Sequence, residues 1–99
     1  MVKHIVSFKL KPFETQEQKA LKLAEFKMGL ESLIGKIDVL KSMEVGININ
    51  LAEAFDFCLV SEFDKFEDVD VYAKHPEHVA VASKIRECLD SRSCVDYFM

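Results

Sequence analysis

Residues 2–10, Val-Lys-His-Ile-Val-Ser-Phe-Lys-Leu, alternate strictly between two sets of side chains. Every second residue from Val2 to Leu10 is apolar except His4, and the residues between them are polar except Ile5. A period of two with β-branched and aromatic residues predicts a β-strand with one side facing a core. Because His4 falls within the apolar set, we expect it to be at least partly buried and to need a hydrogen-bond partner.

A helix is expected after this strand. Pro12 ends the strand, and Thr15 with Gln18 three residues later is a plausible capping box. We expect the helix to run to about Ile34, with Gly35 as its C′ residue. One apolar stripe at helical spacing lies along it: Leu23, Phe26, Leu30, Leu33 and Ile34.

Two more strands are expected in the middle of the chain. In residues 39–49 every second residue from Val39 is apolar except Lys41. Residues 55–63 likewise place Phe55, Phe57, Leu59 and Phe63 on a single face. The polar segment 48–53 connects the two strands. The aromatic face of the second strand is expected to lie in the core.

The segment Tyr72-Ala-Lys-His75-Pro76-Glu-His78 marks the junction of two further helices. The first is expected over residues 66–74, with Phe66, Val69 and Ala73 facing inward and Tyr72 on the flank of that stripe. Pro76 suits the first position of a new helix, which makes His75 its N-cap and places His78 on a core-facing stripe. A polar stretch, residues 91–93, then leads to a last strand over residues 94–99.

The order is therefore β-α-β-β-α-α-β, which predicts a single α+β domain over residues 1–99. Its expected architecture is ferredoxin-like, with a four-stranded antiparallel sheet and helices on one face. The other sheet face is left uncovered and carries Ile5, Cys58 and Val60 among polar groups. We expect a second copy of the chain to cover it, giving a homodimer.

Composition excludes several classes of protein. The net charge is −4, with 13 basic and 17 acidic residues and no basic stripe, so nucleic-acid binding is not expected. No apolar run suits a signal peptide or membrane span, which leaves a cytoplasmic protein as the expectation. Cys58, Cys88 and Cys94 follow no C-x-x-C spacing and are interpreted as buried small hydrophobes, with a disulfide or a thiol nucleophile as alternatives.

Tyr72 and His78 should meet at one corner between helices, with His4 beneath them on the first strand. A phenol and a neutral imidazole in such a place can donate and accept a proton, so Tyr72 and His78 are the candidate catalytic residues. Two alternatives stay open. The cluster can be purely structural, bonded to free backbone groups at the helix ends, or His75, Glu77 and His78 can bind a metal, although the motif is not H-E-x-x-H.

The apolar stripe of the first long helix has two interpretations as well. It can be plain core, or it can form one wall of a small-molecule cavity above His4. In the second case the residues expected to contact a ligand are His4, His75, Phe57, Leu23, Phe26 and Leu30.

Three motifs resemble those of a known family: Lys3-His4-Ile5-Val6 followed by Phe8-Lys9, then Tyr72-x-x-His75-Pro76-x-His78, then Val95-Asp96-Tyr97. The chain is similar over essentially its whole length to the stress-responsive dimeric α/β-barrel (Dabb) domain. This resemblance implies a ferredoxin-like protomer that dimerises through its sheet into a closed barrel. It also implies a cavity in each protomer between sheet and helices.

The same resemblance implies a candidate chemistry. The plant branch of the family includes a polyketide cyclase that needs no cofactor, whose acid/base pair matches Tyr72 and His78 and one of whose cavity histidines matches His4. Phe57 stands where that cyclase has a second cavity histidine. We expect a homodimer that binds a small, partly apolar molecule in this cavity and that, if it is an enzyme, is a cofactor-free cyclase, lyase or isomerase. The alternatives are a non-enzymatic, stress-associated dimer, or a haem-dependent or oxygen-using monooxygenase in which His4, His75 or His78 binds or activates a cofactor.

Overall fold

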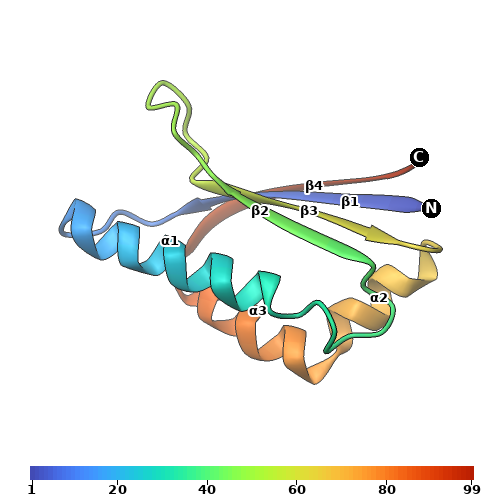
Figure 1. The fold of residues 1–99 in the computed structure, drawn as a ribbon. Coiled ribbons are helices and arrows are strands. Elements are labelled where there is room, and N and C mark those ends of the chain that lie inside the picture. Colours follow the sequence, from blue (N-terminus) through green and yellow to red (C-terminus); the bar gives the residue numbers. More distant parts are fainter.

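A computed structural model describes residues 1–99 and confirms the expected order of elements. Three helices lie on one face of a four-stranded sheet, and the other face is bare (Figure 1). None of the helices combines the length and the apolar character needed to cross a membrane. The elements are β1 (Val2–Leu10), α1 (Gln16–Glu31), β2 (Ser42–Ile47), β3 (Phe57–Phe63), α2 (Glu67–Lys74), α3 (Pro76–Cys88) and β4 (Leu89–Phe98).

The sheet is antiparallel throughout, in the order β2-β3-β1-β4. The predicted alternation of β1 is confirmed, since its burial switches with every residue and the apolar set that includes His4 is buried. In the register of this sheet, His4 lies opposite Ser61 on β3 and Asp96 on β4. Phe8 lies opposite Phe57 on β3 and Arg92 on β4. The side chains of these pairs therefore share the face that the helices cover.

The helix after β1 begins as predicted and ends earlier. Thr15 Oγ1 accepts a hydrogen bond from the Gln18 amide at 3.1 Å, which caps α1. The helix ends at Glu31, because the chain tightens into a turn in which the Leu33 amide bonds to the Leu30 carbonyl. This turn buries Leu33 and leaves Ile34 43% exposed, so the prediction that Ile34 belongs to the buried stripe is wrong.

The middle strands are shorter than predicted. β2 covers only residues 42–47, and Ile49, which was expected on its apolar face, is 93% exposed in the following loop. β3 begins at Phe57 because the preceding Asp56 has a different role. The Asp56 carboxylate accepts from the Leu10 amide at 2.7 Å and pairs with Lys19 at 2.6 Å. It thereby joins the end of β1, the start of α1 and the start of β3.

The second half of the chain differs in two places. In α2, Asp68 and Tyr72 are buried, whereas Phe66 and Ala73 are exposed, so the expectation that Phe66 and Ala73 face inward and Tyr72 sits on the flank is wrong. β4 starts at Leu89, directly after α3, because the segment 91–93 predicted as a connection is paired with β1. Arg92 is thereby a strand residue.

The uncovered sheet face combines polar and apolar side chains. Ile5 and Val60 are direct partners across β1 and β3, and Ile5 pairs with Val95 on β4. Val95 is 59% exposed and Tyr97, two residues further along the same face, is 43% exposed. An apolar patch of this kind at the middle of a bare sheet is typical of an interaction surface.

Candidate functional site

A cavity of about 390 Å³ lies between the sheet and the two helices of the second half of the chain. This volume is within the usual range for small-molecule sites. Fourteen residues line the cavity and ten of them are hydrophobic, contributed by β1, β3, β4 and all three helices. The polar remainder is His4, His78, Arg86 and Arg92.

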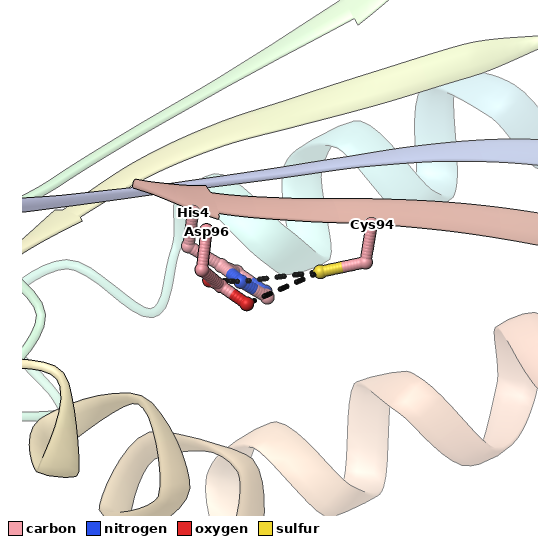
Figure 2. A group of neighbouring side chains, drawn as sticks. All are labelled: His4, Cys94 and Asp96. Carbon is pink, nitrogen blue, oxygen red and sulfur yellow. Dashed lines mark hydrogen bonds and ion pairs between the residues drawn. The ribbon is translucent and has the colours of Figure 1, made fainter. Parts of the chain in front are cut away.

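His4 has the hydrogen-bond partner that its burial demanded. Its Nδ1 lies 2.5 Å from Oδ1 of Asp96, the residue opposite it on β4. A carboxylate oxygen accepts, so Nδ1 donates and the second ring nitrogen is left free. Figure 2 shows both side chains projecting from the sheet toward the helix layer.

Cys94 is the third member of this group and was expected to be buried. It is exposed instead, and its Sγ lies 3.6 Å from both His4 Nδ1 and Asp96 Oδ2 (Figure 2). Desolvation first, and then the neighbouring Asp96 carboxylate, raise the pKa of the Cys94 thiol. A thiol that keeps its proton is a poor nucleophile, which argues against the thiol-nucleophile alternative. Cys58 and Cys88 are free thiols of intermediate exposure.

His4, Cys94 and Asp96 also offer nitrogen, sulfur and oxygen atoms within 4.8 Å of one another, a donor set that zinc accepts. Two ligands on one tetrahedral zinc ion lie roughly 3.3 Å apart. The 2.5 Å between His4 Nδ1 and Asp96 Oδ1 is instead the separation of a short hydrogen bond. The ligand atoms of His75, Glu77 and His78, the metal site considered from the sequence, do not gather in this way.

Tyr72 is 2% exposed and lines the cavity from α2. Its ring centroid lies 4.3 Å from that of His78 and 6.4 Å from that of His4. The Tyr72 hydroxyl is buried and has no hydrogen-bond partner in the protein. Burial raises the pKa of this phenol, so it keeps its proton and remains a hydrogen-bond donor.

His78 lines the cavity from the first turns of α3. Its Nδ1 lies 2.9 Å from the Ala73 carbonyl oxygen, which can only accept, so Nδ1 carries the proton and Nε2 has a free lone pair. Burial is the largest influence on the His78 pKa and lowers it, and the electrostatic influences of His4, Arg86 and His75 lower it further. The Ala73 bond raises the pKa in part. The result is an imidazole that is neutral near pH 7 and able to accept a proton.

The other predicted ligand contacts are divided between the cavity and the core. Leu30 lines the cavity with His4, while Leu23 and Phe26 are core residues of α1 outside it. Phe57 stacks on Phe8 at 4.5 Å, which places it in the core as well. His75 does not line the cavity either.

The prediction that His75 caps α3 is confirmed. Its Nδ1 accepts from the Glu77 amide at 3.1 Å, and Pro76 follows at the start of the helix. This bond uses one of the backbone donors that a helix start leaves free. The imidazole of His75 therefore has a structural role at the start of α3, whereas the hydroxyl of the nearby Tyr72 bonds to nothing in the protein.

Sequence reasoning missed three polar residues near the cavity: Asp96, Arg86 and Arg92. The need of His4 for a partner was predicted, but Asp96 lies 92 residues away and only the pairing of β1 with β4 brings it near. Arg92 was assigned to a connection because Ser91, Arg92 and Ser93 are all polar, and only the pairing of β4 with β1 makes it a strand residue. Arg86 follows His78 and Ala82 at intervals of four and could have been found from the helical period.

Comparison with known proteins gives a consistent assignment. The family model described as the stress responsive A/B barrel domain matches residues 2–99. No curated protein matches the chain in a sequence search.

Solved structures share the fold. A dimeric Bacteroides fragilis protein of unknown function with a ferredoxin-like fold is 46% identical, with a TM-score of 0.93 over 99% of this chain and 95% of its own. An Arabidopsis thaliana protein is 27% identical, with a TM-score of 0.81 over 100% and 95%. A hydroxynitrile lyase from Passiflora edulis is 17% identical, with a TM-score of 0.79 over 99% and 92%, which shows likeness of fold alone.

Proposed function

Because the chain belongs to the stress responsive A/B barrel (Dabb) domain family, we propose that it is a homodimer that binds a small, partly apolar carbonyl compound and acts on it by acid/base chemistry without a cofactor. The cavity between the sheet and the helices is the binding site. Tyr72 and His78 are the reacting groups. The solved relative at 46% identity, described as dimeric, supports the assembly.

The observation that carries this proposal is the unpartnered hydroxyl of Tyr72. A buried donor with no acceptor costs about 1–3 kcal/mol. The Tyr72 hydroxyl is such a donor and its residue lines the cavity, so a ligand oxygen there would supply what the protein does not. A carbonyl oxygen is the simplest acceptor that an apolar ligand can offer.

The two side chains have complementary roles. His78 Nε2 takes a proton from the carbon next to the carbonyl group, and the Tyr72 hydroxyl donates to the carbonyl oxygen as negative charge develops there. A neutral His78 and a protonated Tyr72 are the required states, and the directions of both pKa shifts favour them. The resulting enolate is common to aldol-type cyclisations and to isomerisations.

The bare sheet face is the surface through which two copies would associate. Its apolar centre, formed by Ile5, Val60 and Val95, is continuous across three strands because the first pairs with both of the others. Two such faces packed together would remove this area from water. The cavity is lined from the helix-covered side of the sheet and would stay open in such a dimer.

A thermal-shift screen against small carbonyl and phenolic compounds tests the proposal. We expect a compound that raises the melting temperature of the wild type, has less effect on His78→Ala and Tyr72→Phe, and is turned over only by the wild type. His75→Ala is the matched control, since its imidazole caps the same helix outside the cavity. Unchanged turnover in His78→Ala would show that His78 is not the base.

A second candidate is a non-enzymatic, stress-associated dimer with a structural histidine cluster. The hydrogen bonds of His78 to Ala73 and of His4 to Asp96 favour it, because each imidazole has a partner within the protein. Under this alternative no carbonyl compound binds, and His78→Ala only lowers the free energy of unfolding. An absorption spectrum of the purified protein separates both candidates from a haem protein.

A further inference from the structure

The chain contains two arginines, Arg86 and Arg92, and both line the one cavity described above. They are the charged members of its lining, which includes no aspartate or glutamate. The protein as a whole carries a net charge of −4. The lining of the cavity is therefore cationic in an acidic protein, and the one carboxylate described beside it, that of Asp96, is bonded to His4.

Neither arginine has a carboxylate partner. The seven ion pairs of the structure join acidic groups to His4 and to six lysines, and none involves an arginine. Arg92 lies close enough to Cys94 to lower the pKa of that thiol, which opposes the effect of Asp96. Arg86 lies in the last turn of α3, where a positive charge is favourable. Both guanidinium groups keep most of their donors free.

The backbone places the two arginines near the same end of the cavity. They flank the sharp junction of α3 and β4, three residues before Leu89 and three residues after it. His78, Ala82 and Arg86 follow one another at intervals of four along α3 and all line the cavity. The eight residue steps from His78 to Arg86 correspond to about 12 Å along the helix.

The residues of the sheet that line the cavity follow the same order along it as those of α3. Arg92 lies opposite Phe8 and Asp96 lies opposite His4, four residues apart on each strand, or about 13 Å. By backbone position, both walls thus place the histidines and Tyr72 toward one end and the two arginines toward the other, with the charge of Arg86 acting on the His78 ring and that of Arg92 on Cys94. Mostly hydrophobic side chains lie between.

From this arrangement we propose that the ligand is an amphipathic anion, with its head group bound by Arg86 and Arg92 and its carbonyl group placed between Tyr72 and His78. The head group is a carboxylate or a phosphate, either of which suits the fork of a guanidinium group. The apolar middle of the cavity contacts the chain that joins the two ends. This inference rests on the proposed function, because it names the class of ligand for the same cavity.

Isothermal titration of the full-length protein with matched ligands tests the inference. The probes are 7-oxooctanoate, its neutral methyl ester, and octyl phosphate. The variants are Arg86→Gln, Arg92→Gln and the double change, with Lys84→Gln as the control because Lys84 is exposed on α3, outside the cavity and in no ion pair. Circular dichroism and the melting temperature establish that each variant is folded.

We expect 7-oxooctanoate to bind the wild type at least tenfold more tightly than its ester. Each arginine variant should lose roughly tenfold in affinity for the anion, the size of one charge-assisted hydrogen bond, and little for the ester. Lys84→Gln should bind both as the wild type does. Binding of the anion, but not of the ester, should weaken as salt is added.

The remaining outcomes separate this inference from the proposed function. If the ester binds as tightly as the anion and the arginine variants bind both normally, the proposal of an anionic head group is overturned. The proposed carbonyl site at Tyr72 and His78 is then unaffected. If none of the three probes binds, both are overturned. Octyl phosphate binding more tightly than 7-oxooctanoate, with the same dependence on the arginines, supports the inference and identifies phosphate as the head group.

Discussion

The rings of Tyr72 and His78 lie 4.3 Å apart, centroid to centroid, across the junction of α2 and α3. One ring carries a buried hydroxyl without a partner, and the other has its Nδ1 committed to the Ala73 carbonyl. A free donor and a free ring nitrogen therefore face one cavity from two adjoining helices. This relationship is the basis of the predictions for the two residues.

Replacing Tyr72 by Phe removes the unpartnered hydroxyl and keeps the ring. We expect the variant to be more stable than the wild type by about 1 kcal/mol, because a buried polar group without a partner is lost. Urea unfolding with a linear extrapolation measures the change. A clear loss of stability in Tyr72→Phe would show that the hydroxyl is bonded within the protein.

The depressed pKa of His78 predicts a dependence of stability on pH. Its folded-state pKa lies below the unfolded value near 6.5. The unfolded chain therefore binds the proton more readily, and stability present above about pH 6.5 is lost as the pH falls toward the folded-state pKa. Because His4, His75 and Arg86 also influence the pKa of this ring, the comparison must isolate His78.

His78→Asn is the appropriate variant, since its amide can still donate to Ala73 but does not titrate. We expect the wild type to lose more stability than His78→Asn between pH 7.5 and 5.5. Chemical unfolding at several pH values in this interval measures the difference. Identical pH profiles for the two proteins would mean that the His78 pKa is not depressed.

Removal of the Asp96 carboxylate should expose the dependence of His4 on it. The His4 side chain is 11% exposed and that of Asp96 27%, so the pair is partly screened by solvent. We expect Asp96→Ala to cost about 1–2 kcal/mol, because a largely buried imidazole loses its partner. Asp90→Ala, which breaks an exposed 3.6 Å pair with Lys9, should cost less than half as much. If both substitutions lower the free energy of unfolding equally, the His4–Asp96 hydrogen bond stabilises the fold no more than the exposed Lys9–Asp90 pair.

The sequence predicted the fold well because its signals are local and periodic. The alternation of β1 and the cap of α1 each depend on neighbours within a few residues, and both are confirmed. Pro76 likewise identified the start of α3. Element ends were less predictable. The end of α1 depends on the burial of Leu33, and the start of β3 depends on Asp56, which binds groups 37 and 46 residues away.

The site was predictable in part for the same reason. Tyr72, His78 and His4 were found from helical and strand periods, and all three line the cavity. Leu23 and Phe26 share the apolar stripe with Leu30, but only the position of Leu30 faces the cavity. Periodicity tells which side of a helix is buried and not which buried residue borders a space. Asp96 and Arg92 required knowledge of how β4 pairs with β1.

The last prediction concerns the bare sheet face. Val60→Lys places a charge at its apolar centre, next to Ile5, without touching the cavity on the other side of the sheet. If two copies pack through this face, the buried charge lacks a partner and the dimer should dissociate, which analytical ultracentrifugation measures as a halved mass. Ile49→Lys is the control, because Ile49 is 93% exposed in a loop and should leave the mass unchanged. A Val60→Lys protein that is folded by circular dichroism and keeps the wild-type mass would place the interface on another surface. Loss of ligand binding in the monomer would further show that the cavity depends on the dimer, since Val60 itself lies outside it.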